Sequence, residues 1–189
     1  MISLTKPNRV RMGLLLTVIS LVLLMVSGCG NQDVKPSPGT NQPPASPAAE
    51  EKPSKITLYF SDKQANNLVA EEREVVVKDN SFAETVVKEL IKGPQNKDLV
   101  KTIPVESKLL SLTVSEGVAK VNFSREFQTK HWGGSTGESM TVYSVVDSLT
   151  ELKGINKVQF LIEGQPIESL AGHLDLTQPI EPDKDLIKK

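Results

Sequence analysis

The chain has 189 residues and a net charge of −1, with 38% hydrophobic and 24% charged residues. This length predicts one folded domain. The near-neutral charge argues against nucleic-acid binding, because proteins that bind nucleic acids usually carry a basic surface. Cys29 is the only cysteine, so the sequence excludes an intramolecular disulfide and a cysteine-based metal site.

The N-terminus has the organisation of a secretory signal peptide. Three basic residues within the first eleven precede an apolar run over residues 12–26. The motif Val26-Ser27-Gly28-Cys29 closes that run and resembles a bacterial lipobox, in which the cysteine sulfur is lipidated and the cysteine becomes the new N-terminus. A membrane-spanning helix is the alternative, but a span needs about 20 apolar residues and this run is shorter. We therefore predict a lipoprotein signal peptide over residues 1–28.

Lipidation of Cys29, with palmitate or a similar acyl chain, predicts where the protein resides. Residues 1–28 hold three basic residues and no acidic residue, so the cleaved chain has 161 residues and a net charge of −4. This mild acidity argues against nucleic acid as a partner and against a polybasic membrane patch, so the lipid must provide the anchor. We expect the protein at the outer face of the cytoplasmic membrane.

Residues 29–54 are predicted to be the lipidated cysteine and a disordered tether. Half of the 12 prolines fall between residues 36 and 53, without apolar periodicity. Such a composition cannot bury enough surface to fold, and it favours an extended polyproline conformation of about 3.1 Å per residue. The tether is either a stalk that crosses the cell wall or reaches a partner, or a general lipoprotein spacer.

Alternating and helical apolar patterns predict the elements of a folded domain over residues 55–181. Asn80 or Ser81 caps the first helix, with Glu84 completing a capping box, and Gly93-Pro94 ends it. In chain order, the predicted elements are strands at 56–60 and 68–78, a helix at 82–92, strands at 110–114 and 119–123, a helix at 135–153, and strands at 158–162 and 165–167.

This ββαββαββ order predicts an α+β fold. Each helix has one apolar stripe, so the simplest arrangement is two helices on one face of a mostly antiparallel sheet. The valine run 75–77 is either core or an edge strand that pairs with a neighbour. Residues 182–189 are predicted to be a frayed tail.

Several blocks in the folded part carry a resemblance to a known family. They are Ile56-Thr57-Leu58-Tyr59-Phe60, Leu90-Ile91-Lys92-Gly93-Pro94, Ile103-Pro104, Leu109-Leu110-Ser111-Leu112, Val118-Ala119-Lys120-Val121-Asn122-Phe123-Ser124, Val158-Gln159-Phe160-Leu161-Ile162-Glu163-Gly164 and Gly172-His173-Leu174-Asp175-Leu176. In these blocks the chain resembles the GerMN domain family of sporulation and spore germination lipoproteins in Gram-positive bacteria.

The resemblance implies a fold similar to the ring-building motif of secretion-system-like assemblies, an α+β unit that stacks side by side into rings. The resemblance leaves open whether this protein associates with copies of itself, and it identifies no catalytic residues in the sequence. The best-known sporulation member of the family carries two such domains in tandem, whereas this sequence carries one.

His131 and His173 are the side chains suited to acid–base chemistry near neutral pH. A hydrolase needs a nucleophile, a base and an orienting group in contact, and the sequence has no His-Glu-x-x-His motif. A hydrogen bond between His173 and Asp175 would hold the tail. The glycine-rich segment 133–137 lacks the lysine of a P-loop and is interpreted as a flexible helix entry. No catalytic residue, metal site or cofactor is predicted.

Trp132, the only tryptophan, follows His131 in a polar loop. It is either an interface anchor or a cover for one end of the sheet. We favour a non-enzymatic envelope lipoprotein whose domain is a protein-interaction module that assembles or positions a complex during sporulation or germination. Trp132 and His131 are its candidate interaction residues. The alternative is a peptidoglycan-binding or murein-hydrolase accessory module, which the few aromatic residues and the acidic charge argue against.

Overall fold

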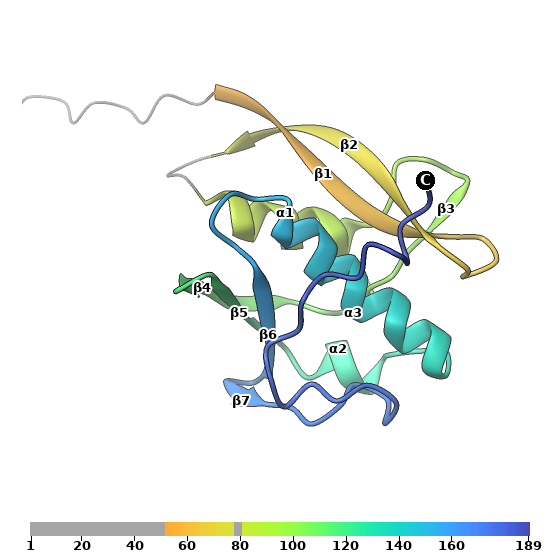
Figure 1. The fold of residues 1–189 in the computed structure, drawn as a ribbon, viewed down its shortest axis with the longest axis vertical. Helices are drawn as coiled ribbons and strands as arrows, with labels where there is room; N and C mark the ends of the chain where they lie inside the picture. The colour runs from red at the N-terminus through yellow and green to blue at the C-terminus, as the bar shows by residue number, and fades with distance from the viewer. Residues whose placement is uncertain (1–51, 78–80) are drawn as a thin grey trace, which may run out of the picture. The chain divides into compact units, whose positions relative to one another are not determined.

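The computed structural model describes residues 52–77 and 81–189 of the chain (Figure 1). The lipobox, Cys29 and most of the tether lie outside these residues, so the lipoprotein prediction is not tested by the structure. In chain order, the elements are β1 (Lys52–Asp62), β2 (Leu68–Val77), α1 (Phe82–Lys92), β3 (Leu99–Val100), β4 (Leu109–Ser115), β5 (Val118–Phe123), α2 (Glu126–Thr129), α3 (Ser135–Thr150), β6 (Lys157–Ile162) and β7 (Gln165–Pro166).

The predicted strands and helices are present within a few residues of their expected positions, and the structure adds the short elements β3 and α2. The first strand starts earlier than the predicted domain boundary at residue 55. Lys52 at the start of β1 is opposite Val77 at the end of β2, and the antiparallel register continues without interruption to Ser61 and Leu68. The folded domain therefore includes the last residues of the segment that was predicted to be tether.

The strands form two sheets, with the orders β2-β1-β3 and β4-β5-β6-β7. All pairs are antiparallel except β5–β6, which is parallel. Both α1 and α3 contact both sheets and lie between them (Figure 1). The α+β class and the mostly antiparallel pairing are confirmed. The single sheet with helices on one face is not what forms, because the helices are covered by strands on two sides.

Short hydroxyl side chains explain how α3 packs on two sides. Ser144 Oγ donates a hydrogen bond to the carbonyl oxygen of Tyr59 on β1 (2.6 Å), and the Tyr59 N–H donates one to Ser148 Oγ (2.9 Å). Both serines are fully buried, so they satisfy a stretch of β1 backbone that would otherwise lose its partners on folding. The predicted apolar stripe of α3 omits this second buried face, because serine is not counted among apolar residues.

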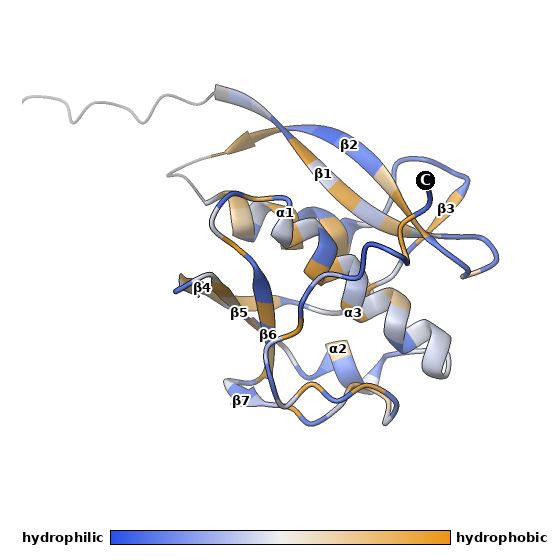
Figure 2. Ribbon diagram, viewed as in Figure 1, coloured by the Kyte–Doolittle hydropathy of each residue, from blue (hydrophilic) through white to orange (hydrophobic). Residues whose placement is uncertain are grey.

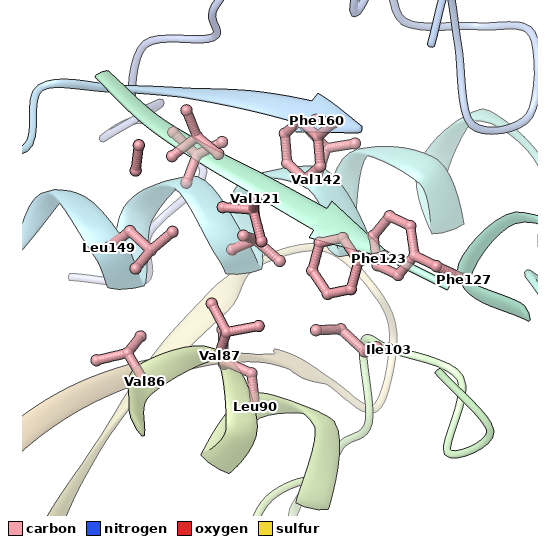
Figure 3. Close-up of a cluster of buried hydrophobic side chains, with 14 of the residues drawn as sticks. Val86, Val87, Leu90, Ile103, Val121, Phe123, Phe127, Val142, Leu149 and Phe160 are labelled. Atoms are coloured by element: carbon pink, nitrogen blue, oxygen red, sulfur yellow. The ribbon is translucent and has the colours of Figure 1, made fainter. Parts of the chain in front are cut away.

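The core is filled by aliphatic and aromatic side chains from both helices and both sheets (Figure 3). Its aromatic part is a stack of Phe123 on β5, Phe127 on α2 and Phe160 on β6. The ring centroids of Phe123 and Phe127 are 4.0 Å apart, and those of Phe127 and Phe160 are 6.2 Å apart. Hydropathy along β1 alternates accordingly, with its apolar residues turned toward the helices (Figure 2). The unpredicted helix α2 exists because Phe127 closes this stack.

The C-terminal tail is attached to the domain, which corrects the prediction of a frayed tail over residues 182–189. The N–H of Leu68 donates to the carbonyl oxygen of Leu186 (2.9 Å), and the N–H of Lys188 donates to the carbonyl oxygen of Leu68 (2.8 Å). Leu186 and Ile187 also pack against a small cluster that includes Tyr59. Two apolar residues within a charged tail were sufficient to bind it to the start of β2.

Candidate interaction site

Trp132 lies in the loop between α2 and α3, and 48% of its surface is exposed. The backbone around it has two positions that favour glycine. Gly133 has a φ of +87°, which favours glycine. A Cβ atom on Gly137 would lie 2.7 Å from the carbonyl oxygen of Trp132, so only glycine fits there. These requirements account for glycine at positions 133 and 137, and the flexible helix entry stays a prediction.

A shallow pocket of ≈ 100 Å³ lies beside Trp132, between the β1–β2 turn, β3 and the first turns of α3. Its apolar lining includes Ala65, Val100 and Met140, and Lys101 is among its polar residues. Val100 is also exposed. Sites for drug-sized molecules have volumes of about 300–1,000 Å³, so this pocket is better suited to one side chain of a partner protein. We call Trp132, Val100 and the pocket between them the Trp132 cleft.

His131 has a structural hydrogen bond beside this cleft. Its Nε2 lies 3.1 Å from Thr141 Oγ1, and that hydroxyl donates its one proton to a backbone oxygen of Thr102 (2.6 Å) or Gly137 (2.9 Å). His131 is therefore the donor to Thr141. Burial lowers the pKa of His131 below its ordinary value, against a smaller opposing effect of the hydrogen bond to Gly137, so the ring is neutral at pH 7. It also stacks on Trp132, with ring centroids 6.2 Å apart.

Glu138 is a buried charged residue that the sequence patterns did not predict. It lies in the first turn of α3 and is fully buried. Its carboxylate accepts hydrogen bonds from Ser169 Oγ (2.8 Å) and from the N–H groups of Leu170, Ala171 and His173 (2.9 Å each). Burial alone would raise its pKa, but these hydrogen bonds outweigh burial and hold the pKa below its ordinary value. Glu138 lies four residues before Val142, which places it in line with the apolar stripe of α3. This position was the feature of the sequence from which its burial could have been predicted.

His173 does not form the predicted hydrogen bond with Asp175. Its backbone N–H donates to Glu138, and the Asp175 carboxylate instead accepts from the N–H (2.9 Å) and the hydroxyl (2.6 Å) of Thr177. His173 therefore does hold the C-terminal region, but through its backbone and a different carboxylate. Among residues 52–77 and 81–189, the two histidine side chains share no hydrogen bond or ring contact.

A second buried charge joins β2 to α1. Arg73 on β2 forms ion pairs with Glu71 on the same strand and with Glu89 on α1 (2.7 Å), and it donates to the carbonyl oxygen of Gly93 (3.0 Å). Glu71 in turn accepts hydrogen bonds from the N–H groups of Gln95 and Asn96. These contacts fix the end of α1 and the loop after it. Their effect is structural, because none of these residues lines the Trp132 cleft and Lys92, which pairs with Glu89, balances the second carboxylate.

Asp147 lies on the face of α3 that the C-terminal tail covers. It is fully buried, and its Oδ1 accepts a hydrogen bond from the N–H of Asp183 (3.1 Å). Burial raises the pKa of Asp147 to about 7, although the nearby charge of Lys184 lowers it. The carboxylate therefore changes its charge near neutral pH. It contacts the tail and no open site, so we assign it an effect on stability.

The described residues, 52–77 and 81–189, contain no group of three or more His, Cys, Asp or Glu side chains that could hold a metal ion. Within the same residues, no helix has the length and apolarity needed to cross a membrane. The half-exposed Trp132 and the pocket beside it are the candidate interaction site.

Comparison with known proteins decides the family. A family model described as "Germane: Sporulation and spore germination" matches residues 57–168, more than half of the chain. This chain belongs to the Germane family. The match begins within β1 and ends after β7, so it spans both sheets and both long helices. The predicted GerMN resemblance is confirmed.

Solved structures agree with the Germane assignment. A candidate lipoprotein from Clostridium perfringens is 28% identical, with a TM-score of 0.50 over 70% of this chain and 89% of that one. The first GerMN domain of the sporulation protein GerM from Bacillus subtilis is 22% identical, with a TM-score of 0.56 over 70% of this chain and 98% of that one. The tandem GerMN domains of GerM give the same identity and TM-score, but only 46% of that chain is covered. No curated protein matches the chain closely enough to count as a relative.

Proposed function

We propose that this Germane protein is a non-enzymatic lipoprotein, attached through Cys29 to the outer face of the cytoplasmic membrane, whose domain is a protein-interaction module. In this proposal it helps to assemble or position an envelope complex during sporulation or spore germination. The family match and the likeness to a candidate lipoprotein support this setting. The signal-peptide pattern before Cys29 supports the lipid anchor.

The observation that carries the proposal is the exposure of Trp132 beside a pocket whose lining includes Ala65, Val100 and Met140. A large aromatic side chain in water is unfavourable for an isolated domain, and tryptophan is enriched among the residues that dominate binding energy at interfaces. The ring also stacks on His131, which is itself hydrogen-bonded to Thr141. The pocket beside the ring accepts one apolar side chain of the partner.

The contacts of the two histidines favour a binding module over an enzyme. His131 is neutral and donates its proton to Thr141, whose own proton is bound to backbone oxygen. A general base needs a free lone pair aimed at a nucleophile, and Thr141 is buried and already committed. His173 contributes only its backbone to the contact with Glu138. Among residues 52–77 and 81–189, neither histidine side chain forms a hydrogen bond with a free serine hydroxyl.

The experiment compares three versions of the full chain in the membranes of the organism that makes it: wild type, Trp132→Ala and Val105→Ala. Val105 is an exposed valine outside the Trp132 cleft, so its variant is the matched control. A partner identified by cross-linking to the wild type and the control is then purified and its affinity measured. We expect Trp132→Ala to weaken binding by about 30-fold, the equivalent of about 2 kcal/mol for a dominant interface residue.

Three results would contradict the proposal. Equal affinity of the partner for wild type and Trp132→Ala would exclude the cleft as its binding site. Sedimentation with purified peptidoglycan, lost in Trp132→Ala, would favour the cell-wall alternative instead. Hydrolysis of muropeptides that depends on His131 would show that the domain is an enzyme.

A further inference from the structure

The outer edge of β4 is the strand edge that the domain leaves open. β4 is the first strand of the sheet β4-β5-β6-β7, so only β5 pairs with it. Among residues 52–77 and 81–189 no other segment forms hydrogen bonds with its free side. Natural proteins usually protect such an edge with charged side chains, proline, a bulge or a covering segment, because an open edge pairs readily with another chain.

β4 carries little of this protection. Its sequence, Leu-Leu-Ser-Leu-Thr-Val-Ser, contains no charged residue and no proline. The one irregularity in its pairing lies between Leu109 and Ser111, so residues 111–115 form a regular strand. Val114 is 47% exposed. A regular, uncharged edge with exposed apolar side chains is the form of strand that binds a further strand.

The other edges of the two sheets are less suited to the same process, and β3 is only two residues long. β2 presents Glu71, Glu72 and Glu74, and the tail covers its first residue, Leu68. β7 is two residues long and includes Pro166, which lacks the N–H needed for pairing. Two copies of β2 placed side by side would bring glutamates opposite one another, and like charges in cross-strand positions are destabilising.

We propose that two copies of this chain associate through antiparallel pairing of their β4 strands, which joins two four-stranded sheets into one. The occupant is a second copy because the edge is neutral. Pairing across a two-fold axis places each β4 residue opposite a β4 residue of the second copy. Because β4 contains no charged residue, this pairing brings no like charges opposite one another. The nearest charged side chain facing this edge from β5 is Lys120, opposite Thr113.

Lys120 does not oppose the pairing. The two Lys120 residues of a dimer would be separated by three strand spacings, about 14 Å, which exceeds the screening length of about 8 Å at physiological salt. The regular segment 111–115 also sets the register. With the two-fold axis at Thr113, Ser111 lies opposite Ser115 and Leu112 lies opposite Val114, so all five residues are paired and hydroxyl residues face each other.

Single cysteines on the full chain test both the pairing and its register. In an antiparallel pair, opposed Cα atoms are about 4.5–5.5 Å apart, which is within the range of a disulfide. Thr113→Cys is therefore expected to give a disulfide-linked dimer under mild oxidation in membranes. Ser111→Cys or Ser115→Cys alone places the two thiols four residues apart along the strand, about 13 Å, and should not cross-link.

The double variant with Ser111→Cys and Ser115→Cys is the decisive control. Within one chain, the thiols at positions 111 and 115 are too far apart to bond. In the proposed register, the thiol at position 111 of one copy lies opposite the thiol at position 115 of the second copy. Cross-linking should therefore return in the double variant. The parent chain, whose Cys29 is its only cysteine, measures the background. Val114→Lys should reduce Thr113→Cys cross-linking to that background, whereas Val76→Lys, at an exposed valine on the β2 edge, should leave it unchanged.

Several outcomes would overturn the inference. Cross-linking of Thr113→Cys no greater than the parent would exclude self-pairing at β4. Equal cross-linking of all single variants would indicate random collision. A product containing a different protein would show that the edge binds another chain. None of these results bears on the Trp132 cleft, because that site lies at the start of α3 and contains no β4 residue.

Discussion

The carboxylate of Glu138 accepts a hydrogen bond of 2.9 Å from the backbone N–H of His173, across 35 residues of sequence. It joins the beginning of α3 to the loop that follows β7. With three further donors on the same carboxylate, this contact closes the C-terminal loop over the helix that carries the Trp132 cleft at its start.

Replacement of Glu138 by glutamine should destabilise the domain strongly. The variant keeps one acceptor oxygen but turns an NH2 group toward backbone donors that are buried with it. Leaving buried donors without acceptors costs about 1–3 kcal/mol for each group, so we expect a loss of at least about 2 kcal/mol in the free energy of unfolding, measured by urea denaturation. Glu84→Gln on α1, which removes an exposed pair with Lys88, should cost under about 0.5 kcal/mol. Similar losses in the two variants would contradict the assignment.

Trp132→Ala and Phe127→Ala should separate the interface from the core. Phe127 is fully buried in the aromatic stack, so its truncation should cost about 3–5 kcal/mol and lower the melting temperature by several degrees at least. Trp132 is half-exposed, and its removal should change the melting temperature much less. Thermal melts of both variants beside the wild type provide the measurement. A drop for Trp132→Ala as large as that for Phe127→Ala would mean that the ring covers the core.

Asp147 should make stability depend on pH. Because burial raises its pKa in the folded state to about 7 from 3.8, folding takes up a proton between these values, and this contribution is complete below pH 3.8 and is lost as the pH rises to 7. Asp147→Asn cannot ionise. The variant should therefore gain stability relative to the wild type between pH 5 and pH 8.

The comparison of Asp147→Asn with the wild type at each pH removes the effect of other groups. Glu71, Glu89 and Glu138 have pKa values below their ordinary values, so their contributions are present at neutral pH and are lost on acidification. These contributions are equal in the two proteins and cancel in the difference. A difference in unfolding free energy that stays constant from pH 5 to pH 8 would refute the predicted titration of Asp147.

Deletion of residues 186–189 should destabilise the domain, in contrast to removal of a frayed end. It leaves the N–H and the carbonyl oxygen of Leu68 without their partners and uncovers the cluster around Tyr59. Each lost backbone hydrogen bond contributes about 0.5–1.5 kcal/mol, so we expect a loss of about 1–3 kcal/mol before the apolar contacts are counted. Hydrogen exchange at the Leu68 amide should also accelerate. An unchanged melting temperature would show that the tail contact is marginal.

Local pattern in the sequence was sufficient for most of the secondary structure. Ile56, Leu58 and Phe60 alternate because their face of β1 packs in the main core, and this period of two is visible without any knowledge of the partner strand. The Gly93 end of α1 was predicted for the same kind of reason, since glycine at a helix terminus acts on its own neighbours. The family resemblance was likewise carried by short contiguous blocks.

The sequence could not assign those elements to sheets. Ser144 and Ser148 lie outside the predicted apolar stripe of α3, and the position of β1 makes them buried hydrogen-bonding groups. The short helix α2 also depends on tertiary contacts. Four residues have little helical tendency of their own, and Phe127 is held by the rings of Phe123 on β5 and Phe160 on β6.

The site divides in the same way. The sequence by itself determined that Trp132 is the only tryptophan, that it lies in a polar loop, and that glycines follow it. Only the tertiary structure decided that the ring is half-exposed over a pocket, that His131 donates to Thr141, and that Glu138 holds the loop at His173. The donor role of His131 depends on Thr102, which lies 39 residues from Thr141, and Glu138 contacts His173 across 35 residues. Periodicity within one segment carries no information about such distant contacts.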